Sequence, residues 1–196
     1  MKKGTIILSV IIIVILGLYM WVKGSYNSMV KADEGVNAAW SQVENVYQRR
    51  ADLIPNLVST VKGYASHEQE TLEGVISARS KATQLTVDAE NLTPEALEKY
   101  QKAQGQLGAA LGKLLSITEN YPDLKANQNF LSLQSQLEGT ENRITVERQK
   151  YNEGARAYNT LIRTFPKTII ANMFGFDKKP YFEAQEGTEA APKVEF

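Results

Sequence analysis

The sequence NQNFLSLQSQLEGTENRITVERQKYNEGARAYNTLIRTF, which runs from Asn127 to Phe165, carries an apolar or aromatic residue at every seventh position. A seven-residue repeat that is kept over five heptads predicts a long α-helix packed along neighbouring helices. Asn127 is a suitable N-cap and Pro166 is a stop signal, so the helix is expected to lie between them. The residues of the row are Phe130, Leu137, Ile144, Tyr151, Tyr158 and Phe165.

The same spacing governs the segment from Tyr26 to Tyr64. One row there contains Trp40, Tyr47 and Ile54, and a second row runs beside it. Pro55 interrupts the pattern without shifting its phase, which predicts a kink near residues 52–54 and not the end of the helix.

Two shorter helices are expected between these long ones. The first covers residues 66–86, and the second opens at Thr93, an N-cap followed by proline, and runs to the break at Tyr121. Three glycines of the second helix, Gly105, Gly108 and Gly112, are interpreted as sites of close helix approach. Four helices with short links predict an all-α, antiparallel up-and-down four-helix bundle with long first and last helices.

An uncharged apolar run, GTIILSVIIIVILGLYMWV, extends from Gly4 to Val22. Its length as a helix matches a hydrocarbon core of roughly 30 Å. Because the run is long and no A-x-A-like cleavage site follows it, an uncleaved transmembrane anchor is favoured over a signal peptide. Lys2 and Lys3 precede the run, and this small excess of positive charge predicts a cytoplasmic amino terminus. The chain is therefore expected to be a single-pass protein of the cell membrane, with its helical domain on the non-cytoplasmic side.

Composition argues against several kinds of chemistry. There is no cysteine and only one histidine, His67, so thiol catalysis and multi-histidine metal sites have no residues to use. Lys+Arg and Asp+Glu are both 22, which gives no basic field for nucleic acid. The string His67-Glu68-Gln69-Glu70 lacks the second histidine of a zinc-peptidase helix, and phosphate-binding and nucleophile-elbow motifs are not found. The sequence predicts no enzyme, no catalytic residue, no metal site and no cofactor.

Several strings along the chain are distinctive: YQRRADLIPNL at Tyr47–Leu57, LGAAL at Leu107–Leu111, ENYPDLKAN at Glu119–Asn127, NFLSLQSQLEGTENRI at Asn129–Ile144, and the Tyr-Asn pairs at Tyr151 and Tyr158. Together they resemble the LemA family of bacterial membrane proteins. The resemblance implies an N-terminal transmembrane helix and a four-helix extramembrane domain, and it supplies no reaction and no catalytic residue. It covers nearly the whole chain from the anchor to about Phe182, and the APKVEF ending is also similar.

Charged residues on or near the predicted apolar faces form a candidate polar cluster. One interpretation is a polar chamber that binds a small molecule or an ion. The other is a buried Arg–Glu network that fixes the register of the helices, since an unpaired buried charge would cost several kcal/mol. The residues are Arg50, Arg79, Glu44, Glu119, Glu141 and Arg148.

A second candidate site is the apolar string FPKTIIANMFGF at Phe165–Phe176. In an up-and-down bundle the last helix returns to the membrane, so this segment is expected either in the bilayer interface or under the base of the bundle. Its candidate interface residues are Phe165, Ile169, Ile170, Met173, Phe174 and Phe176.

The expected organisation is a flank at residues 1–3, an anchor at 4–22, a LemA-like bundle at 25–176 and a flexible tail at 177–196. The expected function is a non-enzymatic, membrane-anchored scaffold or adaptor of the bacterial envelope. Its partners would be the bilayer, through residues 4–22, and a membrane protein or a second copy of the chain, with no nucleic acid. The alternative is a small-molecule or ion sensor that uses a polar Arg/Glu interior.

Overall fold

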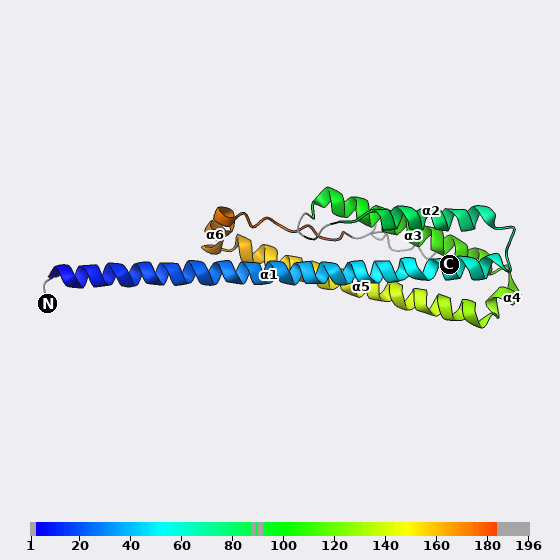
Figure 1. Cartoon of the computed structure of the whole chain (residues 1–196), viewed down its shortest axis with the longest axis horizontal. Helices are drawn as coiled ribbons and strands as arrows, with labels where there is room; N and C mark the ends of the chain where they lie inside the picture. The colour runs from blue at the N-terminus through cyan, green and yellow to red at the C-terminus, as the bar shows by residue number, and fades with distance from the viewer. Residues whose placement is uncertain (1–2, 88, 90–91, 184–196) are drawn as a thin grey trace, which may run out of the picture.

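The structure is a computed structural model that describes residues 3–87, 89 and 92–183. Over these residues it is all-helical, which confirms the predicted fold class. Helices α1, α2, α3 and α5 alternate in direction, α1 lies against α5, and α2 lies against α3 (Figure 1). The helices are α1 (Lys3–Lys62), α2 (Gln69–Gln84), α3 (Pro94–Thr118), α4 (Pro122–Lys125), α5 (Gln128–Arg163) and α6 (Lys167–Phe174).

The anchor and the first helix of the domain form one continuous helix, α1. Its apolar N-terminal part is long enough to cross a membrane, and none of its most hydrophobic stretch is buried in the described chain. From Ser25 onward one face of α1 is buried in the domain. α1 continues through Pro55 to Lys62, so the proline does not end the helix.

Capping residues set the starts of α3 and α5 as the sequence predicts. The side chain of Thr93 accepts a hydrogen bond from the N–H of Ala96 at 3.1 Å. The Oδ1 atom of Asn127 accepts from the N–H groups of Asn129 and Phe130 at 2.9 and 3.1 Å. These bonds satisfy donors that have no partner within the helix.

The seven-residue row of α5 is buried from Phe130 to Tyr158, as expected. Phe165 is the exception, and its placement in the core row is wrong: its side chain is 76% exposed. The reason is that α5 ends at Arg163, so Phe165 lies in the turn before α6 and no longer follows the helical face.

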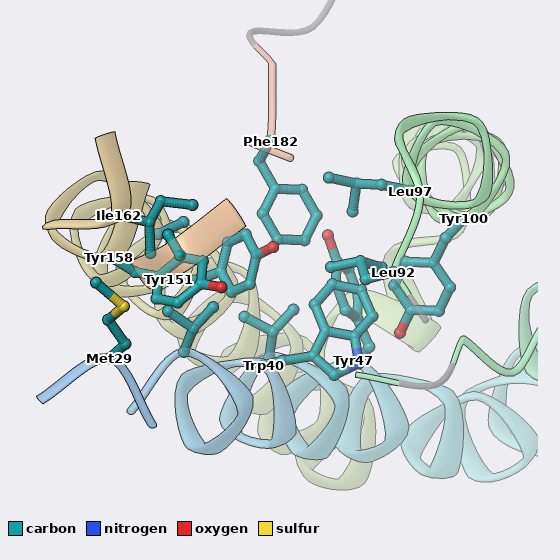
Figure 2. Packing of buried hydrophobic residues seen from close by; sticks show 14 of the residues in the cluster. Met29, Trp40, Tyr47, Leu92, Leu97, Tyr100, Tyr151, Tyr158, Ile162 and Phe182 are labelled. Carbon is teal, nitrogen blue, oxygen red and sulfur yellow. The ribbon is translucent and has the colours of Figure 1, made fainter. Parts of the chain in front are cut away.

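The core consists of two apolar clusters placed one after the other along the helices. The first surrounds Trp40, Tyr100 and Tyr151 (Figure 2), and the second surrounds Leu57, Leu107 and other aliphatic side chains. On α1 the first cluster ends at Tyr47 and the second begins at Ile54. A polar layer separates the two clusters between these positions.

The expectation of a flexible tail from residue 177 is wrong for residues 177–183. This segment runs back along the domain from α6 (Figure 1). Phe182 is buried, and its ring stacks on the indole of Trp40 (Figure 2). A single large aromatic side chain, together with hydrogen bonds to the main chain, holds a segment whose composition is otherwise polar. Residues 184–196, the rest of the expected tail, lie outside the described residues.

Candidate functional site

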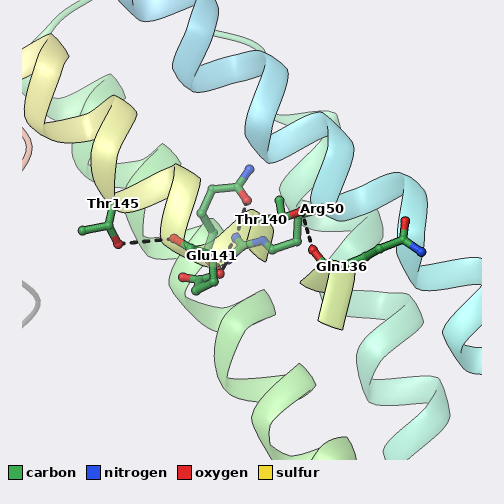
Figure 3. Close-up of polar contacts among 6 residues, drawn as sticks. Arg50, Gln136, Thr140, Glu141 and Thr145 are labelled. Atoms are coloured by element: carbon green, nitrogen blue, oxygen red, sulfur yellow. Dashed lines mark hydrogen bonds and ion pairs between the residues drawn. The ribbon is translucent and has the colours of Figure 1, made fainter. Parts of the chain in front are cut away.

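Arg50 is the centre of the polar layer. Its guanidinium donates from Nη1 to Oε2 of Glu141 at 2.8 Å, which joins α1 to α5 (Figure 3). From Nη2 it donates to the carbonyl oxygen and to Oε1 of Gln104 on α3, at 3.0 and 2.8 Å. The side chain of Arg50 is 4% exposed, whereas that of Glu141 is 59% exposed. One buried cation on α1 thus binds both α3 and α5 and fixes their positions along α1.

The surroundings of Arg50 are partly aromatic. Its guanidinium lies over the ring of Tyr47, 5.1 Å from the centroid, a cation–π distance. Burial raises the pKa of Tyr47 above its ordinary value, and the nearby charges of Arg148 and Arg50 oppose this rise. The Nε atom of Arg50 is buried and has no hydrogen-bond partner within the described residues.

An open groove runs between α3 and α5 beside this layer, with a volume of about 490 Å³. We call it the α3–α5 groove. Arg50 and Tyr47 line it from α1. The walls include Gly105, Gly108 and Gly112 of α3 and Leu137, Glu141 and Arg148 of α5.

The three glycines of α3 do not serve close helix approach, so that interpretation of the sequence is wrong. A Cβ atom added at Gly105 or Gly112 would meet no atom within 4 Å. At Gly108 it would meet only Nη1 of Arg50, at 3.9 Å. The glycines face open space in the groove and not a packed helix.

The structure brings only part of the predicted polar cluster together. Arg50, Glu141 and Arg148 share the α3–α5 groove. Arg79 lies elsewhere and donates from Nε to the carbonyl oxygen of Ala51 at 2.7 Å, which ties α2 to α1. The two remaining acids are apart from the groove lining: Glu44 lines a separate pocket of about 160 Å³, and Glu119 is exposed at the end of α3.

Two asparagines that the sequence analysis did not select bind the main chain of the segment after α6. Asn159 donates to the carbonyl oxygen of Lys179 at 2.8 Å and accepts from its N–H at 2.9 Å. Asn152 forms the same pair of bonds with Phe182, both at 2.9 Å. The repeated Tyr-Asn pair, seven residues apart, was the signal in the sequence that could have identified them.

The last described residue, Glu183, is held from both walls of the groove. Its carbonyl oxygen accepts from Nη2 of Arg148 on α5 at 2.9 Å and from Nε2 of Gln101 on α3 at 2.8 Å. The guanidinium of Arg148 also lies over the ring of Phe182, 4.7 Å from the centroid. Arg148 is therefore a contact of the chain's own C-terminal segment.

The second candidate site, around α6, presents apolar side chains to the outside. Phe165, Ile169 and Met173 are 76%, 52% and 70% exposed. The inner side of α6 contributes Ile170 to the core, which is 2% exposed. Phe174 is half exposed and Phe176 is partly buried.

α6 lies beside α1 at the end of the apolar run. The rings of Phe174 and Phe176 contact the ring of Tyr26 edge to face, with centroids 5.0 and 5.6 Å apart. A pocket between α1 and the turn before α6 is lined by both Trp21 and Phe165. The exposed apolar side chains of α6 are thus next to the segment that is long enough to cross a membrane.

Within residues 3–87, 89 and 92–183 no group of three histidine, cysteine, aspartate or glutamate side chains is arranged to hold a metal ion. The chemistry of the described residues is that of ion pairs, main-chain recognition and apolar contact.

Comparison with known proteins gives one family. The model of the LemA family matches residues 39–196, which include the last part of α1 and all later helices. "Protein LemA" of Metamycoplasma hominis is 26% identical over 175 residues, covering 89% of this chain and 76% of that protein.

Two further relatives are magnetosome proteins by name. "Magnetosome protein MamQ 2" of Paramagnetospirillum magneticum is 28% identical over 179 residues. "Magnetosome protein MamQ" of Magnetospirillum gryphiswaldense is 29% identical over 178 residues. The alignments cover 81% and 80% of this chain, and the chain spans 64% of the length of each of these relatives.

Proposed function

The chain belongs to the LemA family, and from this premise we propose that it is a non-enzymatic, single-pass membrane-anchored scaffold or adaptor of the bacterial envelope. It engages a membrane-protein partner or a second copy of itself. The observation that carries the proposal is the continuity of α1, a single helix of 60 residues that leaves the apolar run and contributes buried side chains to both apolar clusters of the core. A helix of that length is about 90 Å long. Its buried face begins at Ser25, directly after the apolar run ends at Val22, so the domain is joined to the anchor by continuous helix.

α6 supports a second contact with the membrane. Ile169 and Met173 are four residues apart in α6, which places them on one face of that helix, and Phe165 is exposed in the turn before it. They are exposed beside the end of the apolar run, where Trp21 and Tyr26 also lie. Aromatic and apolar side chains with neighbouring lysines, here Lys167 and Lys178, suit the headgroup layer of a bilayer. The proposal is that α6 rests in the interface and limits the tilt of the domain.

The proposed orientation has the amino terminus in the cytoplasm and the domain outside it. Lys2 and Lys3 precede the apolar run, and the positive-inside rule favours that side for them. Alkaline phosphatase fused to the C-terminus is expected to be active, and a fluorescent protein that folds only in the cytoplasm is expected to be dark. The reverse pattern would overturn the orientation.

A small-molecule or ion sensor is the second candidate, and the α3–α5 groove is the observation that favours it. The groove is open and contains Arg50, whose Nε atom is unpartnered among the described residues. The charge of Arg50 is already paired with Glu141, however, and its Nη2 atom donates to Gln104. This pairing supports the register-fixing role of the cluster over the role of an ion-binding chamber.

The experiment that tests the scaffold is crosslinking in living cells, followed by recovery of the full chain in a mild detergent. The control carries the anchor alone, residues 1–24. A protein recovered reproducibly with the full chain and not with the anchor supports the adaptor, and crosslinked copies of the chain itself support self-association. If both baits recover the same proteins, the helical domain does not engage a partner and the proposal fails.

A further inference from the structure

The segment after α6 approaches the α3–α5 groove along one line. Its contacts with α5 move from Asn159, through Asn152, to Arg148, while the bound residues advance from Lys179 to Glu183. Eleven positions of α5 correspond to about 16 Å of helix, and four steps of extended chain cover about 13 Å. The segment therefore runs antiparallel to α5 in a nearly extended form.

The direction of this line leads into the groove. Beyond Arg148, the next inward positions of α5 are Ile144, Glu141 and Leu137, and all three line the groove. Glu183 is held at the entrance by Arg148 and by Gln101 of the opposite wall, both of which are groove residues. The described chain thus ends between the two walls with its carboxyl side toward the groove.

We infer that the α3–α5 groove is the docking site of the chain's own C-terminal segment, residues 184–196, which binds as an extended strand. The inference is independent of the scaffold function, since it concerns contacts within one chain. The distance from Arg148 to Leu137 along α5 is about 16 Å, which about five extended residues cover. The thirteen residues that follow Glu183 are therefore sufficient to fill the groove and leave it at the far end.

The chemistry of the groove suits a main chain. Gly105, Gly108 and Gly112 leave space on the wall of α3, so a backbone can approach that helix closely. On the wall of α5, the carboxylates of Glu138 and Glu141 offer acceptors for main-chain N–H groups. Leu111 and Leu115 add apolar surface to the lining of the groove. The contacts already made with residues 179–183 are also mostly to main-chain atoms.

The absence of cysteine from the chain allows a direct test. In the full chain in nanodiscs, Gly112→Cys is combined in turn with Gly187→Cys, Thr188→Cys and Glu189→Cys, and the rate of intramolecular disulfide formation is measured. The matched control replaces Gly112→Cys with Gly74→Cys. Gly74 is an exposed glycine of α2 where an added Cβ also meets no atom within 4 Å.

For at least one tail position, the disulfide with Gly112→Cys is expected to form about tenfold faster than the disulfide with Gly74→Cys. The reason is that docking raises the concentration of the tail cysteine beside position 112. Adding Arg148→Ala is expected to reduce that ratio. Equal rates at the two glycine positions would overturn the inference, and so would the lack of any disulfide with Gly112→Cys.

Hydrogen exchange on the unmodified chain provides a second measurement that needs no substitution. Amides of residues 184–190 are expected to exchange about tenfold more slowly than those of a synthetic peptide with the same sequence, because docking shields them from water. Exchange at the rate of the free peptide would overturn the inference.

Discussion

The ring of Phe182 stacks on the indole of Trp40, with the centroids 5.8 Å apart and the ring planes at 16°. The two residues lie 142 positions apart in the sequence, one on α1 and one beyond the last helix. The ring of Tyr151 contacts that of Phe182 edge to face, with centroids 5.4 Å apart. The guanidinium of Arg148 also lies over the ring of Phe182. The segment after α6 is therefore part of the first apolar cluster of the core.

We predict that Phe182→Ala lowers the free energy of unfolding by about 3–5 kcal/mol, the usual cost of truncating a buried phenylalanine. Thermal or denaturant unfolding of the full chain in detergent, followed by circular dichroism, measures the change. Phe165→Ala is a control of the same chemistry at a position that is 76% exposed, and it is expected to cost less than about 0.5 kcal/mol. Similar losses for the two variants would show that Phe182 does not belong to the core.

The long helices could be predicted because their information is local. The repeat from Phe130 to Tyr158 specifies one buried face, and Asn127 and Thr93 carry their capping function in their own side chains. Phe165 was placed in the core wrongly because the seven-residue repeat of the sequence continues past Arg163, where the helix ends.

The candidate site was less predictable because its geometry depends on how the helices are placed against each other. The sequence identified Arg50 and Glu141 as charges near the core, but nothing local pairs two residues 91 positions apart. Glu119 was selected from the sequence as a charge of the same kind, but it lies exposed at the end of α3. The binding of residues 179–183 was missed because polar composition indicates a loose tail, whereas main-chain hydrogen bonds to Asn152 and Asn159 are independent of the tail's side chains.

The ion pair in the polar layer is asymmetric, and this predicts unequal effects of its two partners. Glu141→Ala removes the carboxylate that pairs with a buried guanidinium and is expected to cost roughly 2–4 kcal/mol. Arg50→Met is expected to cost about 1–2 kcal/mol, because the exposed Glu141 returns to water and mainly Gln104 loses a partner.

Denaturant unfolding of both variants provides the comparison. The control is Glu138→Ala, one turn earlier on α5, where the carboxylate accepts a hydrogen bond from Gln134 of the same helix. That change is expected to cost less than about 0.5 kcal/mol. A larger loss for Arg50→Met than for Glu141→Ala would contradict the assigned roles.

The buried tyrosines predict a loss of stability at alkaline pH. Burial raises the pKa of Tyr100 and Tyr151 well above the ordinary value of 10, and raises that of Tyr158 to about 12. Asp33 and Asp177 add to the rise at Tyr158. The folded state therefore holds these protons more tightly than the unfolded state does, so their contribution is complete below pH 10 and is lost as the pH rises through the folded pKa values.

Unfolding measured as a function of pH, together with the absorbance of tyrosinate, tests this prediction. The free energy of unfolding is expected to decrease above about pH 10, and Tyr158→Phe is expected to make that decrease less steep because one of the linked protons is removed. A stability that is constant above pH 10, or that rises there, would be inconsistent with the burial of these phenols.

The final prediction concerns α6 and the bilayer. In nanodiscs that contain lipids with a nitroxide quencher near the headgroup, a fluorophore at Met173→Cys is expected to be quenched strongly, because Met173 is exposed beside the end of the apolar run. The matched control is Leu131→Cys. Leu131 is an exposed apolar residue near the start of α5, at the end of that helix that is far from α6. If α6 instead rests on other protein, both fluorophores are expected to be quenched equally weakly. Strong quenching at Met173 alone would show that the domain meets the membrane at two places, through α1 and through α6.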